Sequence, residues 1–419
     1  MNNKKNILSL SILLFSICLF LNNYCMFFWS TYSSTSMISI YRLISYCGVV
    51  FLFSVALISK RIKHTVSISG LAVLALVIIN IIHRKLISNS TMQMFSITDG
   101  VILLCVVLLV LLDDKSKKDI FSLSLKIFVI VCLPSLIYFV LSFIGINIPH
   151  SILQSSHALK SARGLYYDKY FFGLILKTPY QSDRFCGIFD EPGVVGTLAA
   201  IFFAGGYKKM NKVWLILLLI EGFFSLSLAF YLLLMIFVII RAICDGLAKF
   251  AICGIVLIML LTFFLNIKTD NEFITNIQNR MDLSSSFIFI DNRTSDAYED
   301  EFNSFLQGDK NELFFGRGSG AAESNYLMSS SWSYKNIIYD YGMIGFCLLI
   351  IFVVMCFVYG GIGKSSACFF VVFLISIYQR PDIFNVEYIS ILICGIAYND
   401  ERVHDKSNLI NYSYSKSGD

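Results

Sequence analysis

The sequence predicts an all-α integral membrane protein, a polytopic bundle of about 12 transmembrane helices with two large loops on one face. Three observations support this. Hydrophobic residues make up 57% of the 419 residues and charged residues only 15%, with a mean hydropathy of +0.72, which no soluble fold needs. Apolar windows long enough for membrane helices follow one another along the chain. Basic residues occupy every second connection between them.

The apolar windows give the order of the expected helices. They lie at 7–24, 37–58, 65–82, 96–112, 120–146, 192–207, 213–227, 228–243, 249–267, 338–359, 366–379 and 385–398. The first window lacks a small-residue cleavage site and further windows follow it, so we interpret it as a retained helix.

These windows divide the chain into six parts. We expect helices one to five in 1–146, a first large loop at 147–187, helices six to nine in 188–267, a second large loop at 268–337, helices ten to twelve in 338–398 and a tail at 399–419.

The basic residues predict the orientation of the bundle. Those in alternate connections, which the positive-inside rule places in the cytoplasm, are Lys4, Lys5, Lys60, Arg61, Lys63, Lys115, Lys117, Lys118, Lys208, Lys209, Lys212, Arg241, Lys249, Lys364, Arg402 and Lys406. Arg84, Lys85 and Arg380 break the rule in short connections on the opposite side. In a bacterium, this orientation puts both termini in the cytoplasm and makes both large loops periplasmic loops of the inner membrane.

The two large loops carry opposite charge. The first contains five Lys or Arg against two Asp, and the second contains eleven carboxylates against six Lys or Arg. We therefore expect the loops to attract each other and to form one cap over the membrane. The alternative is that each loop is an ordinary solvated surface.

Composition excludes several other classes of function. The net charge of +5 is too small to indicate a nucleic-acid partner. The cysteines lie mostly in apolar windows, without a CxxC pair or a Cys/His cluster, so no metal site and no cofactor are expected.

The segment 184–193, where the chain returns to the membrane after the first large loop, has two interpretations. In the structural one, Pro192 begins a helix and Asp190 or Glu191 caps it. In the functional one, Arg184 and the first N–H groups of the helix bind a phosphate or pyrophosphate. Gly187 and Gly193 then allow close approach of the ligand, and Glu191 orients or deprotonates an attacking hydroxyl. Physical chemistry alone does not separate the two.

A resemblance favours the functional interpretation. The motif resembles the signature of the O-antigen polymerase (Wzy) family, within the O-antigen ligase/polymerase superfamily, and reads Arg184-x-x-Gly187-x-Phe189-x-Glu191-Pro192-Gly193. The layout of spans and loops is also similar. A second similarity is a glycine turn followed by a span opening, Phe314-Phe315-Gly316-Arg317-Gly318-Ser319-Gly320 and Tyr339-Asp340-Tyr341-Gly342-Met343-Ile344-Gly345-Phe346.

The resemblance implies a glycosyltransferase of lipopolysaccharide biosynthesis, working without a nucleotide. The growing glycan would leave undecaprenyl pyrophosphate for a hydroxyl of the next lipid-linked repeat unit, with membrane lipid around the site. A chain-length regulator protein is a further partner that the resemblance leaves open. The expected catalytic residues are Glu191, Arg184, Arg280 and Arg293, and the expected substrate-binding residues are Gly187, Asp190, Pro192, Gly193, Arg317 and Asp340.

Two alternatives stay open. A flippase or other transporter of lipid-linked oligosaccharide would usually show internal repeats, and none is evident. The related ligases typically carry a histidine shortly before the tenth span, whereas the second large loop here contains no histidine.

Overall fold

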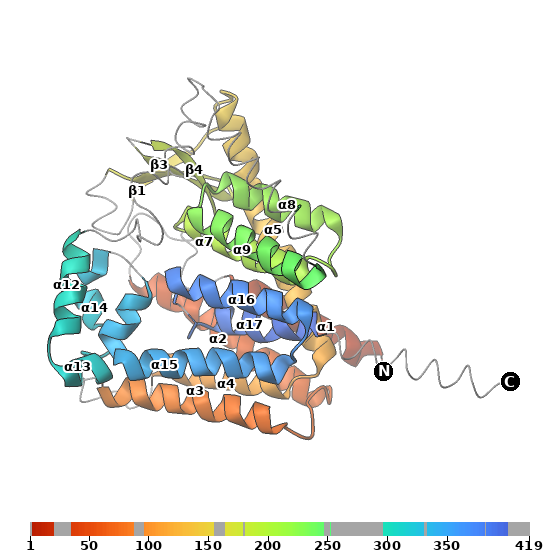
Figure 1. Cartoon of the computed structure of the whole chain (residues 1–419). Helices are drawn as coiled ribbons and strands as arrows, with labels where there is room; N and C mark the ends of the chain where they lie inside the picture. The colour runs from red at the N-terminus through yellow and green to blue at the C-terminus, as the bar shows by residue number, and fades with distance from the viewer. Residues whose placement is uncertain are drawn as a thin grey trace.

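The structure is a computed structural model that describes residues 2–20, 35–87, 96–154, 164–178, 181–246, 252, 296–330, 333–381 and 383–400. Most of these residues are helical (Figure 1). The bundle helices are α1 (Asn2–Leu19), α2 (Thr35–Ile58), α3 (Ile68–Ile87), α4 (Ile97–Leu111), α5 (Asp114–Phe143), α7 (Pro192–Gly206), α8 (Lys212–Phe224), α9 (Leu228–Asp245), α15 (Tyr334–Gly360), α16 (Lys364–Gln379) and α17 (Val386–Asn399). Each expected window coincides with one of them, except 249–267, of which only residue 252 is described.

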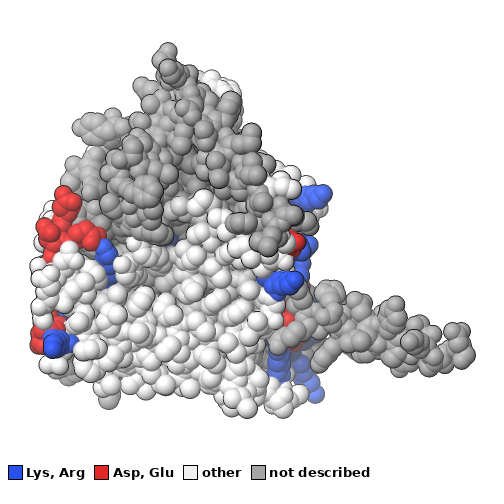
Figure 2. Space-filling model, in the orientation of Figure 1, with Lys and Arg blue, Asp and Glu red and all other residues white. Residues whose placement is uncertain are grey.

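Several helices are suited to a membrane. Among the described helices, four are long and apolar enough to cross one, namely α3, α5, α9 and α15, and shorter apolar helices accompany them. Figure 2 shows charged side chains gathered at the two ends of the bundle and an uncharged surface between them. Large apolar side chains such as Ile68 and Leu86 of α3 are exposed, as on a lipid-facing surface. The chain therefore has the helices of an integral membrane protein, while the number of spans stays a prediction.

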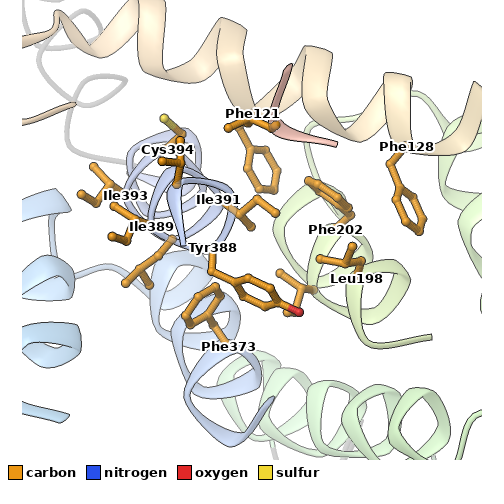
Figure 3. Close-up of a cluster of buried hydrophobic side chains, with 14 of the residues drawn as sticks. Phe121, Phe128, Leu198, Phe202, Phe373, Tyr388, Ile389, Ile391, Ile393 and Cys394 are labelled. Carbon is orange, nitrogen blue, oxygen red and sulfur yellow. The ribbon is translucent and has the colours of Figure 1, made fainter. Parts of the chain in front are cut away.

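The core lies where α5, α7, α16 and α17 meet (Figure 3). Phe121 and Phe128 of α5 both contact Phe202 of α7, with ring centroids 5.6 and 5.4 Å apart. Phe373 of α16 packs on Tyr388 of α17. Phe121 also contacts Phe369 of α16, and α16 packs directly on α7, so the core fixes these two helices relative to each other.

The connections that carry the predicted cytoplasmic cations lie at one end of the bundle. Arg61 forms an ion pair with Asp113 at 3.1 Å, which joins the α2–α3 connection to the start of α5. Lys117 donates to the hydroxyl of Tyr359, near the end of α15, at 2.7 Å. Arg241 of α9 lies 3.5 Å from the Ser365 hydroxyl of α16. Successive helices therefore run in opposite directions, which brings the connections with basic residues to the same end.

The first large loop contains a sheet that the all-α prediction did not include. Its strands are β1 (Ser151–Gln154), β2 (Tyr166–Tyr170), β3 (Gly173–Thr178) and β4 (Gln181–Gly187), antiparallel in the order β1-β2-β3-β4. Leu153 pairs with Tyr167, and Tyr167 with Leu176, so these side chains share one face. They form a small apolar core of their own. The sheet gives β4 a fixed path to the start of α7.

The second large loop packs on the start of α15. Its described helices are α12 (Asp296–Gln307), α13 (Lys310–Phe315) and α14 (Ala321–Ser324), followed by a 3-10 turn at Met328–Ser330. Tyr298, Phe302 and Phe305 share one side of α12 and form a core with Ile338 and Tyr339.

The expected attraction between the two loops is not found among the described residues. Lys177 pairs with Asp168 and Asp183 inside the first loop. Burial alone would lower the pKa of Lys177, but its hydrogen bond to Asp183 raises it above the usual value. Every other ion pair of the loops in the described ranges is also internal to one loop. Complementary charge is used within each loop, so the expected single cap has no ion pair to support it there.

Candidate active site

The segment 184–193 runs from the last strand of the sheet into α7. Gly187 ends β4 with φ +63°, and a Cβ there would lie 2.8 Å from Cys132 Sγ of α5. The amide of Phe189 then donates to the carbonyl of Cys186 at 3.1 Å, which closes a turn. Pro192 occupies the first turn of α7, as the sequence predicts. Gly193 follows it and is buried.

Glu191 occupies the N-cap position of α7 but does not cap it. Its side chain makes no capping hydrogen bond, so the structural interpretation is wrong for this residue. Instead, Oε2 of Glu191 accepts from Nη2 of Arg380 at 2.6 Å. The Arg380 side chain is 7% exposed and that of Glu191 is 35% exposed. A buried cation therefore holds a carboxylate that remains open to solvent.

Arg380 is a residue that the sequence-based site prediction missed. It directly follows α16, which packs on α7, and its guanidinium reaches Glu191 at the start of α7. Burial alone would lower its pKa, but the charge of Glu191 raises it above the usual value, so Arg380 remains a cation. Its sequence signal was its position as an exception to the positive-inside rule.

Arg184 ties the sheet to the connection between α8 and α9. It lies on β4 opposite Leu176. Its Nη2 donates to the backbone carbonyl of Leu226 at 3.1 Å and lies 3.5 Å from that of Ser225. The same connection packs tightly on α7, since a Cβ at Gly196 would lie 2.5 Å from Ser227 Cβ. Arg184 and Glu191 therefore stand on either side of the turn that starts α7.

Asp190 completes this turn through its backbone. The hydroxyl of Tyr167 on β2 donates to the carbonyl oxygen of Asp190 at 2.6 Å. The sheet thus holds the turn from one side while Arg380 holds Glu191 from the other.

The glycine turn and the α15 opening, which the resemblance paired, pack against each other. Gly342 interrupts α15 with φ 68° and ψ −179°, so the helix bends between 334–341 and 343–360. The amides of Arg317 and Gly318 donate to the carbonyls of Tyr339 and Asp340, both at 2.9 Å. A Cβ at Gly316 would lie 2.3 Å from the Asp340 carbonyl oxygen. Gly316 and Gly342 meet at this contact, and only glycine, which has no Cβ, leaves room for it at both positions.

Asp340 and Arg317 have partners within this structure. Oδ1 of Asp340 accepts from the amide of Ala322 at 2.7 Å, and Oδ2 accepts from the amide of Gly320 at 3.3 Å. Nε of Arg317 pairs with Glu312 at 2.7 Å, and its Nη1 pairs with Glu301 at 3.2 Å and contacts the hydroxyl of Tyr339. Both side chains thereby fasten the turn to α15.

The structure brings part of the predicted site together. Arg184, Gly187, Asp190, Glu191, Pro192 and Gly193 lie along the end of β4 and the start of α7, and Arg317 packs on the start of α15, which contains Asp340. Arg280 and Arg293 lie outside the described residues. Within the described ranges, no group of three or more His, Cys, Asp or Glu side chains is placed to hold a metal ion.

The arrangement suits the binding of an anion beside a carboxylate. The Arg380 guanidinium contacts Glu191, which is partly exposed at the start of α7, where the first amides carry positive partial charge. A second guanidinium, that of Arg184, lies on β4, which leads into this helix. No protein-family model matches the chain, and no curated protein matches it. A functional assignment therefore rests on the fold and the site residues.

Proposed function

We propose that this protein is an O-antigen or surface-polysaccharide polymerase of the bacterial inner membrane, with termini in the cytoplasm and an active site facing the periplasm. The observation that carries the proposal is the pairing of Glu191 with Arg380 at the start of α7. This ion pair brings Arg380, which lies outside the 184–193 motif, to the carboxylate of the motif. The packing of the glycine turn on α15 is further support, because it unites the other two segments of the resemblance.

The proposed reaction is a glycosyl transfer between two lipid-linked substrates. The bond between the anomeric carbon of the growing glycan and its undecaprenyl pyrophosphate breaks, and its electron pair stays on the pyrophosphate. The acceptor hydroxyl of the incoming unit bonds to that carbon and loses its proton. Arg184 and Arg380 would stabilise the departing pyrophosphate, and Glu191 would orient the acceptor hydroxyl and receive the proton.

Deletion of the gene in its host tests the proposal. Extracted surface polysaccharide would be compared on a gel after complementation with the wild type, Arg184→Ala or Glu191→Gln. We expect the deletion to leave one repeat unit on its acceptor without a ladder, and both variants to fail to restore the ladder. Arg61→Ala, at the opposite end of the bundle, and Asp183→Asn, an ion-paired carboxylate of the same loop, are the matched controls and should restore it.

Other outcomes would contradict the proposal. Loss of even the single attached unit would favour a flippase or a ligase. Polymer still made on its lipid carrier would then indicate a ligase, and unflipped units trapped inside the cell would indicate a flippase. A full ladder with Arg184→Ala or Glu191→Gln would contradict the assignment of the site.

A further inference from the structure

Arg84, in the last turn of α3, is held by aromatic side chains from two distant segments. Its Cζ lies 4.4 Å from the ring centroid of Tyr341 on α15 and 4.7 Å from that of Phe384 in the α16–α17 connection. Its Nη2 donates to the hydroxyl of Tyr341 at 3.0 Å. The neighbouring His83 donates through Nε2 to the Tyr341 carbonyl at 3.0 Å. Arg84 is therefore positioned firmly, by stacking rather than by charge.

This lack of a carboxylate partner distinguishes Arg84 from other cations at the same end. Cations of this end that have a carboxylate partner within the described ranges include Lys85 with Asp99 (2.9 Å), Lys335 with Glu299 (2.6 Å), Arg380 with Glu191 (2.6 Å) and Arg317 with Glu312 (2.7 Å). Arg84 forms no ion pair there. The described carboxylate with which it interacts electrostatically is that of Asp340, so within these ranges Arg84 can also accept an anionic ligand.

The surroundings of Arg84 add hydrogen-bonding groups suited to a phosphate. Stacking occupies the faces of a guanidinium, and the N–H groups of Arg84 other than the one that donates to Tyr341 can bond to phosphate oxygens. The Tyr341 hydroxyl lies 3.0 Å from that of Ser319 in the glycine turn, so two hydroxyls stand beside this edge. The nearby carboxylate of Asp340 is engaged with the amides of Gly320 and Ala322.

We propose that Arg84, with the hydroxyls of Tyr341 and Ser319, forms a second phosphate-binding site, distinct from the α7 start, for the pyrophosphate of the second lipid-linked substrate. This rests on the proposed function, because transfer between two lipid-linked glycans requires two pyrophosphate groups at the same face. The connection after α16 links the sites, since it carries both Arg380 and Phe384. One site would hold the donor and the other the acceptor.

Ligand binding to the purified full-length protein tests the site independently of polymerisation. Geranylgeranyl pyrophosphate would be titrated into the wild type, Arg84→Gln, Arg84→Lys and Arg61→Gln in detergent. We expect two bound equivalents for the wild type and for Arg61→Gln. For Arg84→Gln we expect one equivalent, with the second weakened about tenfold or more. Arg84→Lys should resemble Arg84→Gln, because lysine keeps the charge but loses the bidentate edge.

Further measurements identify the ligand and test whether a folding defect explains the loss of binding. Tyr341→Phe removes one hydroxyl while keeping the ring, and should weaken the second equivalent without lowering the melting temperature. Inorganic pyrophosphate should compete at the site, and phosphatidylglycerol vesicles should not. Competition by the vesicles alone would overturn the ligand assignment. Wild-type stoichiometry in Arg84→Gln would overturn the site.

The binding result and the proposed function can fail separately. A gene deletion that leaves polymer length unchanged would contradict the function, whatever the stoichiometry. Loss of one equivalent in Arg84→Gln would still establish a phosphate site at Arg84.

Discussion

Two regions at the same end of the bundle use charged residues in opposite ways. In the α7-start region, 184–193 with Arg380, a buried guanidinium holds a carboxylate that stays 35% exposed. In the glycine-turn region, 314–320 with 339–342, backbone amides occupy Asp340, and two carboxylates occupy Arg317. The comparison shows that a charged residue in a motif is not thereby available to a substrate. The α7-start region presents a charged group to solvent, whereas the charged side chains of the glycine-turn region, Asp340 and Arg317, are used to hold the fold.

The largest expected effect on stability comes from removing Glu191. Glu191→Ala leaves Arg380 buried without its carboxylate, so the free energy of unfolding should fall by about 3 kcal/mol. Thermal unfolding in detergent measures this change. Adding Arg380→Met should recover part of the loss, because the uncompensated charge is then gone. A double variant less stable than Glu191→Ala would show that the pair is not coupled in this way.

Gly342→Ala should cost about 2 kcal/mol, because a side chain at φ 68° is strained. Its Cβ would also lie 2.2 Å from the Phe314 carbonyl oxygen. The matched control is Gly145→Ala, which shares a positive φ of +82° but has no atom within 4 Å of its Cβ. The melting temperature should fall more for Gly342→Ala than for the control. Equal shifts would show that the contact between the turn and α15 contributes nothing.

Arg317→Gln should have the smallest effect. The Arg317 side chain is 34% exposed, and solvent and salt screen its pairs with Glu301 and Glu312. We expect a loss of about 1 kcal/mol that shrinks as the salt concentration rises. Melting curves at low and high salt measure it. A stable Arg317→Gln protein that no longer extends glycan would instead support the sequence-based prediction that Arg317 binds substrate.

Much of the helical architecture follows from hydropathy. The window 192–207 agrees with α7, and 228–243 with α9, because an apolar run in a membrane must satisfy its backbone by forming a helix. The sheet was missed because the loop was interpreted by its charge. Its strands are short, and β3 does not alternate, because Ile175 between Leu174 and Leu176 is buried as well.

The site was only partly predictable, for a physical reason. The sequence indicates that 184–193 is unusual, but Arg380 lies 189 positions after Glu191, and no local pattern joins them. Helix packing makes that pair. The useful signal was a violated rule, since Arg84, Lys85 and Arg380 are cations in short connections that the positive-inside rule predicts to lack them. The structure gives each of them a specific partner.

The proposed division of roles is that Glu191 and Arg184 of the α7-start region carry the chemistry, while the charged side chains Asp340 and Arg317 maintain the fold. Measuring chain extension per folded molecule tests it. Glu191→Gln and Asp340→Asn would each be purified, quantified as folded protein and supplied with lipid-linked repeat units. We expect Glu191→Gln to be folded but inactive. We expect Asp340→Asn to give less folded protein, with nearly normal activity per molecule. Normal activity in Glu191→Gln, together with a folded but inactive Asp340→Asn, would contradict it.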